Sequence, residues 1–216
     1  MKSYRVILFL IAILFLFTQY ENRSSGINYR NSYSKKIFIP AFVRNKLASG
    51  DIILRSGKGF ISDVFKQFSL KDKTYSHAGI VSIEKDGIFV YHILGEEQED
   101  GRINSGSLKK DLLETFCNPD ENRSYAVYRY DLSALSKEKM INRLKTASEE
   151  KIIFDSQFDL ASDSAMYCTE LIYKVVTSAS ADKDYIPVTI VDEKKYIAPD
   201  NLYLNRHATF VYSNIF

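Results

Sequence analysis

Two apolar segments on either side of an Asp-Gly pair constrain the fold more than any other feature. Residues 76–83 and 88–94 have the length and composition of strands, and the sequence Glu-Lys-Asp-Gly occupies 84–87 between them. Asp-Gly between two such segments is a strong signal for a β-hairpin, because glycine adopts the positive φ that a tight turn requires. We therefore predict an antiparallel hairpin with Ile83 opposite Ile88.

The rest of the chain from residue 41 alternates between short apolar segments and helical patterns. Strands are predicted at 51–55, 125–130 and 208–212, and helices at 60–68, 107–116, 136–149 and 167–177. Ser107 is expected to cap the second of these helices. Helices combined with an antiparallel sheet indicate an α+β fold. A chain of 216 residues with 45% hydrophobic content is sufficient for one full core.

The N-terminal region differs from the rest of the chain. Lys2 and Arg5 precede an unbroken apolar run from residue 6 to 17, which is shorter than the roughly 20 apolar residues of a membrane span. This pattern is typical of a secretory signal, and it also fits an anchor that attaches the protein to the membrane. We predict a signal peptide or anchor at 1–21, a polar tether at 22–40 and one domain at 41–216, exported to the periplasm or cell envelope.

Charge and cysteine content argue against several classes of function. The chain has 29 basic and 27 acidic residues, and outside its first 25 residues the two are balanced. This balance does not favour a nucleic-acid partner. Two cysteines are too few for a disulfide framework. Because the sequence has no His-Glu-x-x-His or paired-cysteine motif, we predict neither a metal nor another cofactor.

Two of the three histidines lie on the predicted hairpin. With Ile83 opposite Ile88, His77 pairs with Leu94, and alternation along the strands places His77 and His92 diagonally on one face. Diagonal neighbours are about 7–8 Å apart, a gap that two imidazoles can bridge. Such a pair suits a general base whose tautomer is fixed by a second polar group. Two half-buried histidines without a function would give the same pattern.

Cys168 begins the apolar-faced helix predicted at 167–177. The positive end of the helix dipole favours a thiolate there, and a thiolate is the nucleophilic form of cysteine. A small core residue at a helix start is the simpler alternative, because free cysteines are commonly buried. Cys117 follows a short predicted helix without such a setting, and we interpret it as structural.

Three ordered motifs resemble a known family of enzymes. They are Gly50-Asp51-Ile52-Ile53-Leu54, Tyr75-Ser76-His77-Ala78-Gly79-Ile80-Val81 and Tyr167-Cys168-Thr169-Glu170-Leu171-Ile172. From about Leu47 onward the chain resembles the permuted papain-like amidases, the YiiX-like branch of the NlpC-type cysteine hydrolases. The resemblance implies a circularly permuted papain-like fold, with an antiparallel sheet packed with helices. The histidine motif precedes the cysteine motif, whereas papain has the reverse order.

The resemblance also implies three catalytic roles. Cys168 matches the nucleophile, His77 matches the base, and His92 stands where relatives carry a polar residue that orients the base. Relatives often have glutamate at that position, so His92 departs from the commonest pattern. The implied reaction is acyl transfer, in which the sulfur of Cys168 attacks an amide or ester carbonyl and His77 protonates the leaving group.

Substrate contacts are expected from three further residues. Asp51 of the Gly-Asp pair is expected to line the pocket, although an aspartate that opens a strand is more often a turn residue. Tyr75 and Tyr167 flank the base and the nucleophile, where they would bind substrate or simply pack. Export and the resemblance favour a small peptide, cell-wall peptide or N-acylated amino acid as substrate. A lipid-amide substrate, a lipid acyl hydrolase or acyltransferase, and an inactive binding module remain the alternatives.

Overall fold

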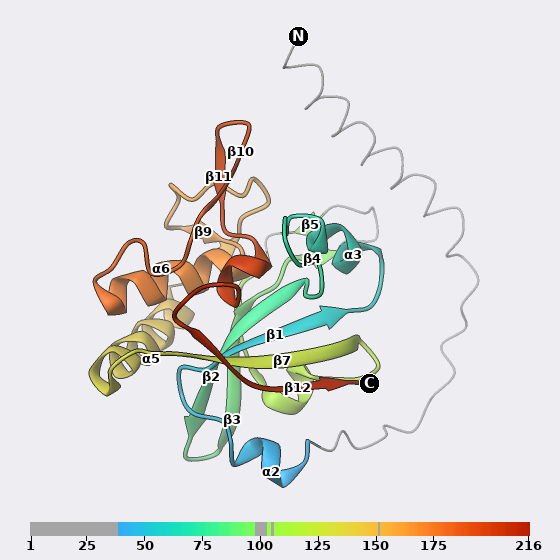
Figure 1. Ribbon diagram of the computed structural model, residues 1–216, viewed down its shortest axis with the longest axis vertical. Coiled ribbons are helices and arrows are strands. Elements are labelled where there is room, and N and C mark those ends of the chain that lie inside the picture. Colours follow the sequence, from blue (N-terminus) through green and yellow to red (C-terminus); the bar gives the residue numbers. More distant parts are fainter. Residues whose placement is uncertain (1–38, 98–102, 105, 151) are drawn as a thin grey trace, which may run out of the picture. The chain divides into compact units, whose positions relative to one another are not determined.

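The computed structural model describes residues 39–216 apart from 98–102, 105 and 151 (Figure 1). The signal or anchor predicted at 1–21 and all but the last two residues of the tether predicted at 22–40 lie outside these residues. Within the described ranges, no helix is both long enough and apolar enough to cross a bilayer.

A six-stranded antiparallel sheet forms the centre of the fold, with strand order β12-β7-β1-β2-β3-β6. Its strands are β1 (Ile52–Gly57), β2 (His77–Glu84), β3 (Gly87–Ile93), β6 (Leu108–Leu112), β7 (Asn122–Tyr130) and β12 (Ala208–Ile215). Three two-stranded sheets accompany it: β4 (Glu96–Glu97) with β5 (Ile103–Asn104), β8 (Ile153–Phe154) with β9 (Ala165–Met166), and β10 (Thr189–Val191) with β11 (Lys194–Tyr196). The predicted α+β class is confirmed.

Helices cover both faces of the large sheet. They are α2 (Ala41–Arg44), α3 (Phe60–Lys66), α4 (Leu113–Phe116), α5 (Ala134–Glu149), α6 (Cys168–Ser180) and the 3₁₀ helix η1 (Pro199–Leu202). On β1, Ile52 and Leu54 face a core shared with α5 and α6, whereas Ile53 faces a second core shared with α2 and α4. Every residue of β1 is buried, which is expected for a strand with both faces covered.

The predicted hairpin and its register are confirmed. Ile83 pairs with Ile88, and Glu84 pairs with Gly87, so Lys85 and Asp86 alone form the turn. The ladder is therefore one pair longer than expected, but the faces on which the side chains lie are unchanged, because the register is the same.

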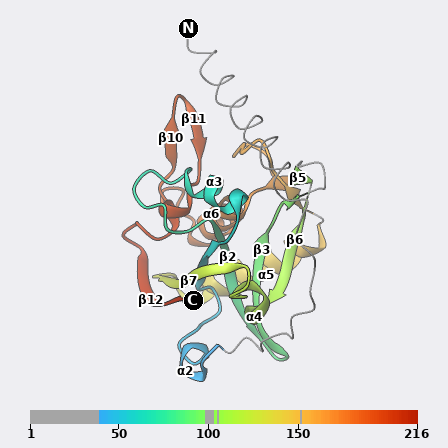
Figure 2. The same cartoon turned by 90° about the vertical axis from the view of Figure 1, so that its right-hand side faces the viewer.

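The helix predicted at 107–116 is wrong over 108–112 and confirmed at 113–116. Leu108–Leu112 is the edge strand β6, which pairs with β3, and the short helix α4 follows it (Figure 2). The segment Lys-Lys-Asp has no apolar alternation, but lysine is common on edge strands, where it discourages pairing with other chains. The Lys110 ammonium lies 4.1 Å from the centre of the Phe89 ring and 2.6 Å from Glu84 Oε2. Pairing with β3 therefore decides the structure here, and Ser107 forms a bridge with Ile153 instead of a cap.

Candidate active site

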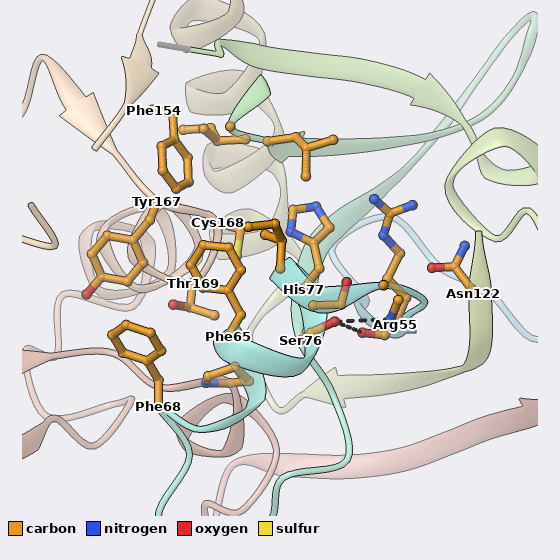
Figure 3. Close-up of a pocket in the computed structure, with 18 of the residues that line it drawn as sticks. Arg55, Phe65, Phe68, Ser76, His77, Asn122, Phe154, Tyr167, Cys168 and Thr169 are labelled. Atoms are coloured by element: carbon orange, nitrogen blue, oxygen red, sulfur yellow. Dashed lines mark hydrogen bonds between the residues drawn. The ribbon is translucent and has the colours of Figure 1, made fainter. Parts of the chain in front are cut away.

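A cavity of about 450 Å³ lies where β1 and β2 meet the start of α6 (Figure 3). Cys168 and His77 both line it, together with Arg55, Ser76, Asn122 and several aromatic side chains. The volume falls within the range of about 300–1,000 Å³ that is common for small-molecule sites. The structure thus brings the predicted nucleophile and the predicted base, 91 positions apart in the sequence, to one cavity.

Cys168 is the first residue of α6, and the turn that follows is firmly held. The Tyr167 N–H donates to Glu170 Oε2 at 3.2 Å, and the Thr169 hydroxyl donates to the Ile197 carbonyl at 2.5 Å. The first N–H groups of a helix have no partner within the helix. The Cys168 N–H is therefore placed to stabilise an oxyanion that forms on a carbonyl attacked by its own sulfur.

His77, His92 and Asp111 form a continuous hydrogen-bonded chain. His77 Nε2 lies 2.9 Å from His92 Nδ1, and His92 Nε2 lies 2.9 Å from Asp111 Oδ2. The two rings meet edge to face, with centroids 5.0 Å apart. Gly79 makes room for this arrangement, because a Cβ there would lie only 2.4 Å from Val90 Cγ1 and 3.2 Å from His92 Cβ. The diagonal pair predicted from the pleat is thus in contact, and Asp111 is an unpredicted third member.

The carboxylate of Asp111 fixes the tautomers of both imidazoles. Its hydrogen bond with His92 lowers the pKa of Asp111, so at neutral pH the carboxylate only accepts. His92 must then carry its proton on Nε2 and present a lone pair at Nδ1. His77 in turn donates from Nε2, which leaves its Nδ1 free to accept a proton. This polarity is the one that a base for the Cys168 thiol requires.

Burial governs the protonation of the two histidines. His77 is 7% exposed and His92 is 1% exposed, and both rings pack against Phe116. Burial lowers the pKa of His77 well below its usual value, and the positive charge of Arg55 acts in the same direction. Burial also lowers the pKa of His92, although the hydrogen bond with Asp111 opposes this. His77 is therefore neutral at physiological pH, with Nδ1 able to accept a proton.

The thiol of Cys168 is neutral as well. Burial raises its pKa to about 11, while backbone N–H groups of Ala78 and Thr169 and the charge of Arg55 lower it by less. The position at a helix start led us to expect a thiolate, but here desolvation outweighs the helix dipole. A neutral thiol and a neutral imidazole are the protonation states in which Cys168 can donate its proton to His77.

Alkylation of Cys168 should therefore depend steeply on pH. With a thiol pKa of about 11, the rate constant for iodoacetamide should rise about tenfold per pH unit between pH 7 and 10. The Cys168→Ala variant supplies the background, because Cys117 is fully buried and burial raises its pKa too. A rate constant that is constant from pH 5 to 8 would show a preformed thiolate and contradict this account.

Removal of Asp111 should weaken the base without abolishing activity. Asp111→Ala is expected to lower kcat/KM by about tenfold, because residues that orient a catalytic group typically contribute 10- to 100-fold and the Asp111 side chain is 32% exposed, so water can replace it in part. The acidic limb of the pH profile should also move to lower pH, since a nearby carboxylate favours the imidazolium.

The control is Asp86→Ala, which removes an exposed carboxylate from the turn of the same hairpin. Asp111→Glu should recover part of the loss. An unchanged pH profile in Asp111→Ala would reduce Asp111 to a structural residue.

The structure gives Asp51 a structural position instead of the expected place in the pocket. Asp51 is fully buried, and both of its oxygens lie 2.7 Å from nitrogens of Arg129. Oδ2 also accepts the Ala48 N–H at 2.8 Å. It is not among the residues that line the cavity. The Gly-Asp motif thus fixes the chain that enters β1, which corrects the expectation of substrate binding.

The two tyrosines differ in their position. Tyr75 packs edge to face against Tyr203 at 5.3 Å and does not line the cavity, so the expectation that it binds substrate is also corrected. Tyr167 lines the cavity, where its hydroxyl accepts the Ile197 N–H at 2.8 Å. With the hydroxyl engaged, Tyr167 offers its ring to a substrate. Cys117 is buried and free, as expected of a structural cysteine.

Arg55 and Asn122 are two of the polar residues of the cavity that the sequence did not single out; Lys58, Ser62, Asp120 and Glu121 also line it. Arg55 pairs directly with His77 across β1 and β2, and its guanidinium lies 4.7 Å from the centre of the Phe116 ring. An arginine inside a fully buried strand was the available signal, since arginine is seldom fully buried unless paired. Asn122 opens β7 and has no comparable signal in the sequence.

The fold and the cavity together define a papain-like architecture, with a cysteine at a helix start and a histidine on the adjacent sheet. Residues 46–210 match the model of the permuted papain-like amidase enzymes, YaeF/YiiX, C92 family, and the chain belongs to this family. The suggested resemblance is thereby confirmed, and membership implies an amide hydrolase.

A solved structure supports the fold. The crystal structure of the metalloprotein YiiX from Escherichia coli O157:H7 matches with a TM-score of 0.59 and 19% identity, over 78% of this chain and 98% of that chain. In the described part of the present chain, no group of three His, Cys, Asp or Glu side chains is arranged to hold a metal ion. A comparison with curated protein sequences finds no match.

Proposed function

We propose that this protein is a cysteine amidase in which Cys168 is the nucleophile, His77 the general base and acid, and His92 the residue that orients His77. The observation that carries the proposal is the chain of hydrogen bonds from Asp111 through His92 to His77, in a cavity that His77 and Cys168 both line. Family membership supports the same reaction class.

The reaction follows from the tautomers. The Cys168 sulfur attacks the amide carbonyl as its proton moves to His77 Nδ1, and the negative oxygen faces the Cys168 N–H. His77 then protonates the leaving nitrogen, the C–N bond breaks, and a thioester remains on Cys168. Water attacks the thioester with His77 as base, which releases a carboxylic acid and restores the thiol. No oxidant, reductant or cofactor is required.

The substrate is proposed to be a small amide of the cell envelope, either a cell-wall peptide or an N-acylated amino acid. A cavity of about 450 Å³ supports a small substrate. The aromatic side chains in its lining favour a second candidate, a hydrolase or transferase that acts on lipid acyl groups, because such groups bind to apolar walls.

The test is product analysis with purified protein. Wild type and Cys168→Ala are incubated with cell-wall peptides, N-acylated amino acids and acyl esters of lipids, and released amines, acids and alcohols are identified by mass spectrometry. Release of amine by the wild type alone supports the amidase. Release of alcohol only would favour the lipid hydrolase, and release of neither with a folded protein would leave a binding module.

Export is proposed from the basic start and the apolar run at 6–17. Fractionation of cells that express the full chain should therefore recover it with the envelope or outside the cell. A variant with Leu10 and Leu14 changed to glutamate should stay in the cytosol, because a charge in the apolar run opposes insertion. Recovery of the wild-type chain from the cytosol with an intact N-terminus would contradict the proposal.

A further inference from the structure

We infer that the cavity selects amides with an apolar acyl group and with a carboxylate on the leaving amine, that is, N-acyl amino acids with a free α-carboxylate. The inference rests on the proposed amidase function and names its substrate class. It is supported by the residues at two opposite ends of the cavity (Figure 3).

One end of the cavity is an aromatic wall, formed by Phe65, Phe68, Phe154, Phe158 and Tyr167. The rings are in mutual contact: the Phe68 and Phe158 centroids are 4.9 Å apart, as are those of Phe158 and Tyr167. Figure 3 shows this wall on the side of Cys168 away from Arg55, with the labelled rings around the cavity. A wall of this kind binds an aliphatic or aromatic group, since it removes apolar surface from water.

Phe158, one of the residues of this wall, has a strained backbone conformation. Its φ is 54°, in the left-handed region that a residue with a bulky side chain rarely adopts. The buried carboxylate of Asp155 maintains this conformation, because it accepts the Gln157 N–H at 2.7 Å and the Asp159 N–H at 2.6 Å. Strain of this kind is frequent at functional sites. The turn at 155–159 thus places Phe158 in the lining of the cavity.

The other end of the cavity carries the buried cation Arg55, and the lining of the cavity also includes the charged side chains of Lys58, Asp120 and Glu121. The Arg55 side chain is 10% exposed, Nη1 donates to the Phe116 carbonyl at 3.0 Å, and Glu121 Oε2, on a side chain that is 65% exposed, lies 3.9 Å away. Beside Arg55 in the cavity wall, Asn122 is fully buried, and its Oδ1 has no hydrogen-bond partner among the described residues. A buried guanidinium is best stabilised by a close carboxylate with which it forms two hydrogen bonds. A ligand can supply that carboxylate.

The chemistry decides which part of the substrate lies at which end. His77 must protonate the leaving nitrogen, so the amine lies on the His77 side of the attacked carbonyl, and the acyl group points the other way. Arg55 is the direct cross-strand partner of His77, and such pairs have Cβ atoms about 4.5–5.5 Å apart. A carboxylate one carbon from the leaving nitrogen then lies on the Arg55 side of the cavity, while the acyl chain extends to the aromatic wall.

The test compares three substrates: N-decanoylglycine, its neutral analogue N-decanoylglycinamide, and N-acetylglycine. The wild type should prefer N-decanoylglycine to the glycinamide by about 10- to 100-fold in kcat/KM, as expected for hydrogen bonds to a charged group. It should also prefer the decanoyl to the acetyl substrate. Arg55→Gln should lose the preference for the acid over the glycinamide and keep the preference for decanoyl over acetyl. Phe68→Ala should have a smaller preference for decanoyl over acetyl and an unchanged preference for the acid.

Matched controls are Arg143→Gln, an exposed arginine paired with Glu150, and Phe210→Ala, an exposed phenylalanine of β12. Neither should change either preference. Turnover of amides by the wild type without a preference for the acid overturns the inference but leaves the amidase intact. If Arg55→Gln lowers kcat/KM equally for N-decanoylglycine and for the glycinamide, the inference is also overturned, since Arg55 would then act on the oxyanion or the base. Absence of turnover of every amide by a folded protein overturns the amidase and the inference with it.

Discussion

Replacement of Cys168 by alanine is expected to lower kcat on an amide substrate by more than about 10⁴-fold, as losses of this size follow removal of a catalytic nucleophile. The variant keeps the cavity, the hydrogen-bonded chain and Arg55, so substrate binding should change little. The measurement is turnover together with the affinity for uncleaved substrate, by calorimetry.

Cys117→Ala is the matched control, because it removes the other thiol of the chain from a fully buried position outside the cavity. It should lower stability modestly and leave turnover almost unchanged. Loss of turnover in Cys117→Ala with full activity in Cys168→Ala would exchange the assignments and refute the site.

His77→Ala is expected to lower kcat by about 10³-fold, within the range for a general acid and base. His92→Ala should lower kcat by about 10- to 100-fold, because His92 orients the base and does not itself contact the substrate. The double variant should be hardly worse than His77→Ala alone, since His92 acts only through its 2.9 Å contact with His77.

The measurement is kcat/KM for the four proteins of this cycle, with thermal unfolding to confirm that each is folded. Losses at His77 and His92 that multiply independently would contradict the coupling. His92 is almost fully buried, so His92→Gln, which fills more of the space, serves as a second variant.

The geometry of the histidine pair could be predicted because it depends on local rules. The Asp-Gly turn sets the register of the hairpin, and the pleat then places His77 and His92 on one face. The structure has this register and brings their nitrogens within 2.9 Å. Cys168 could be placed at a helix start from the apolar pattern of α6, although its protonation could not, because burial depends on the surrounding fold.

Asp111 could not be predicted because its strand has no pattern of its own. The residues around it are charged, and only the pairing of β6 with β3 makes them a strand. Asp111 also affects which residues can replace His92. A glutamate at position 92, common in relatives, would here place a second carboxylate beside Asp111, and two such charges repel each other. His92→Glu should therefore recover activity only when combined with Asp111→Asn.

Arg55 and the aromatic wall were missed for a related reason. The wall joins residues of α3 and the segment after it, β8, the turn at 155–159 and the residue before α6, which the sequence gives no reason to bring together. Asp51, by contrast, was overvalued, because a motif shared with a family does not distinguish a residue that supports the site from one that binds substrate.

The most direct test of the central claim is the mass of the protein after incubation with N-decanoylglycine and rapid acid quenching. A thioester on Cys168 should add one decanoyl group, and peptide mapping should place it on the peptide that contains Cys168. Hydroxylamine should remove the group, and Cys168→Ala should not acquire it. A decanoyl group on Cys117, or turnover of the amide by Cys168→Ala at the wild-type rate, would contradict the account.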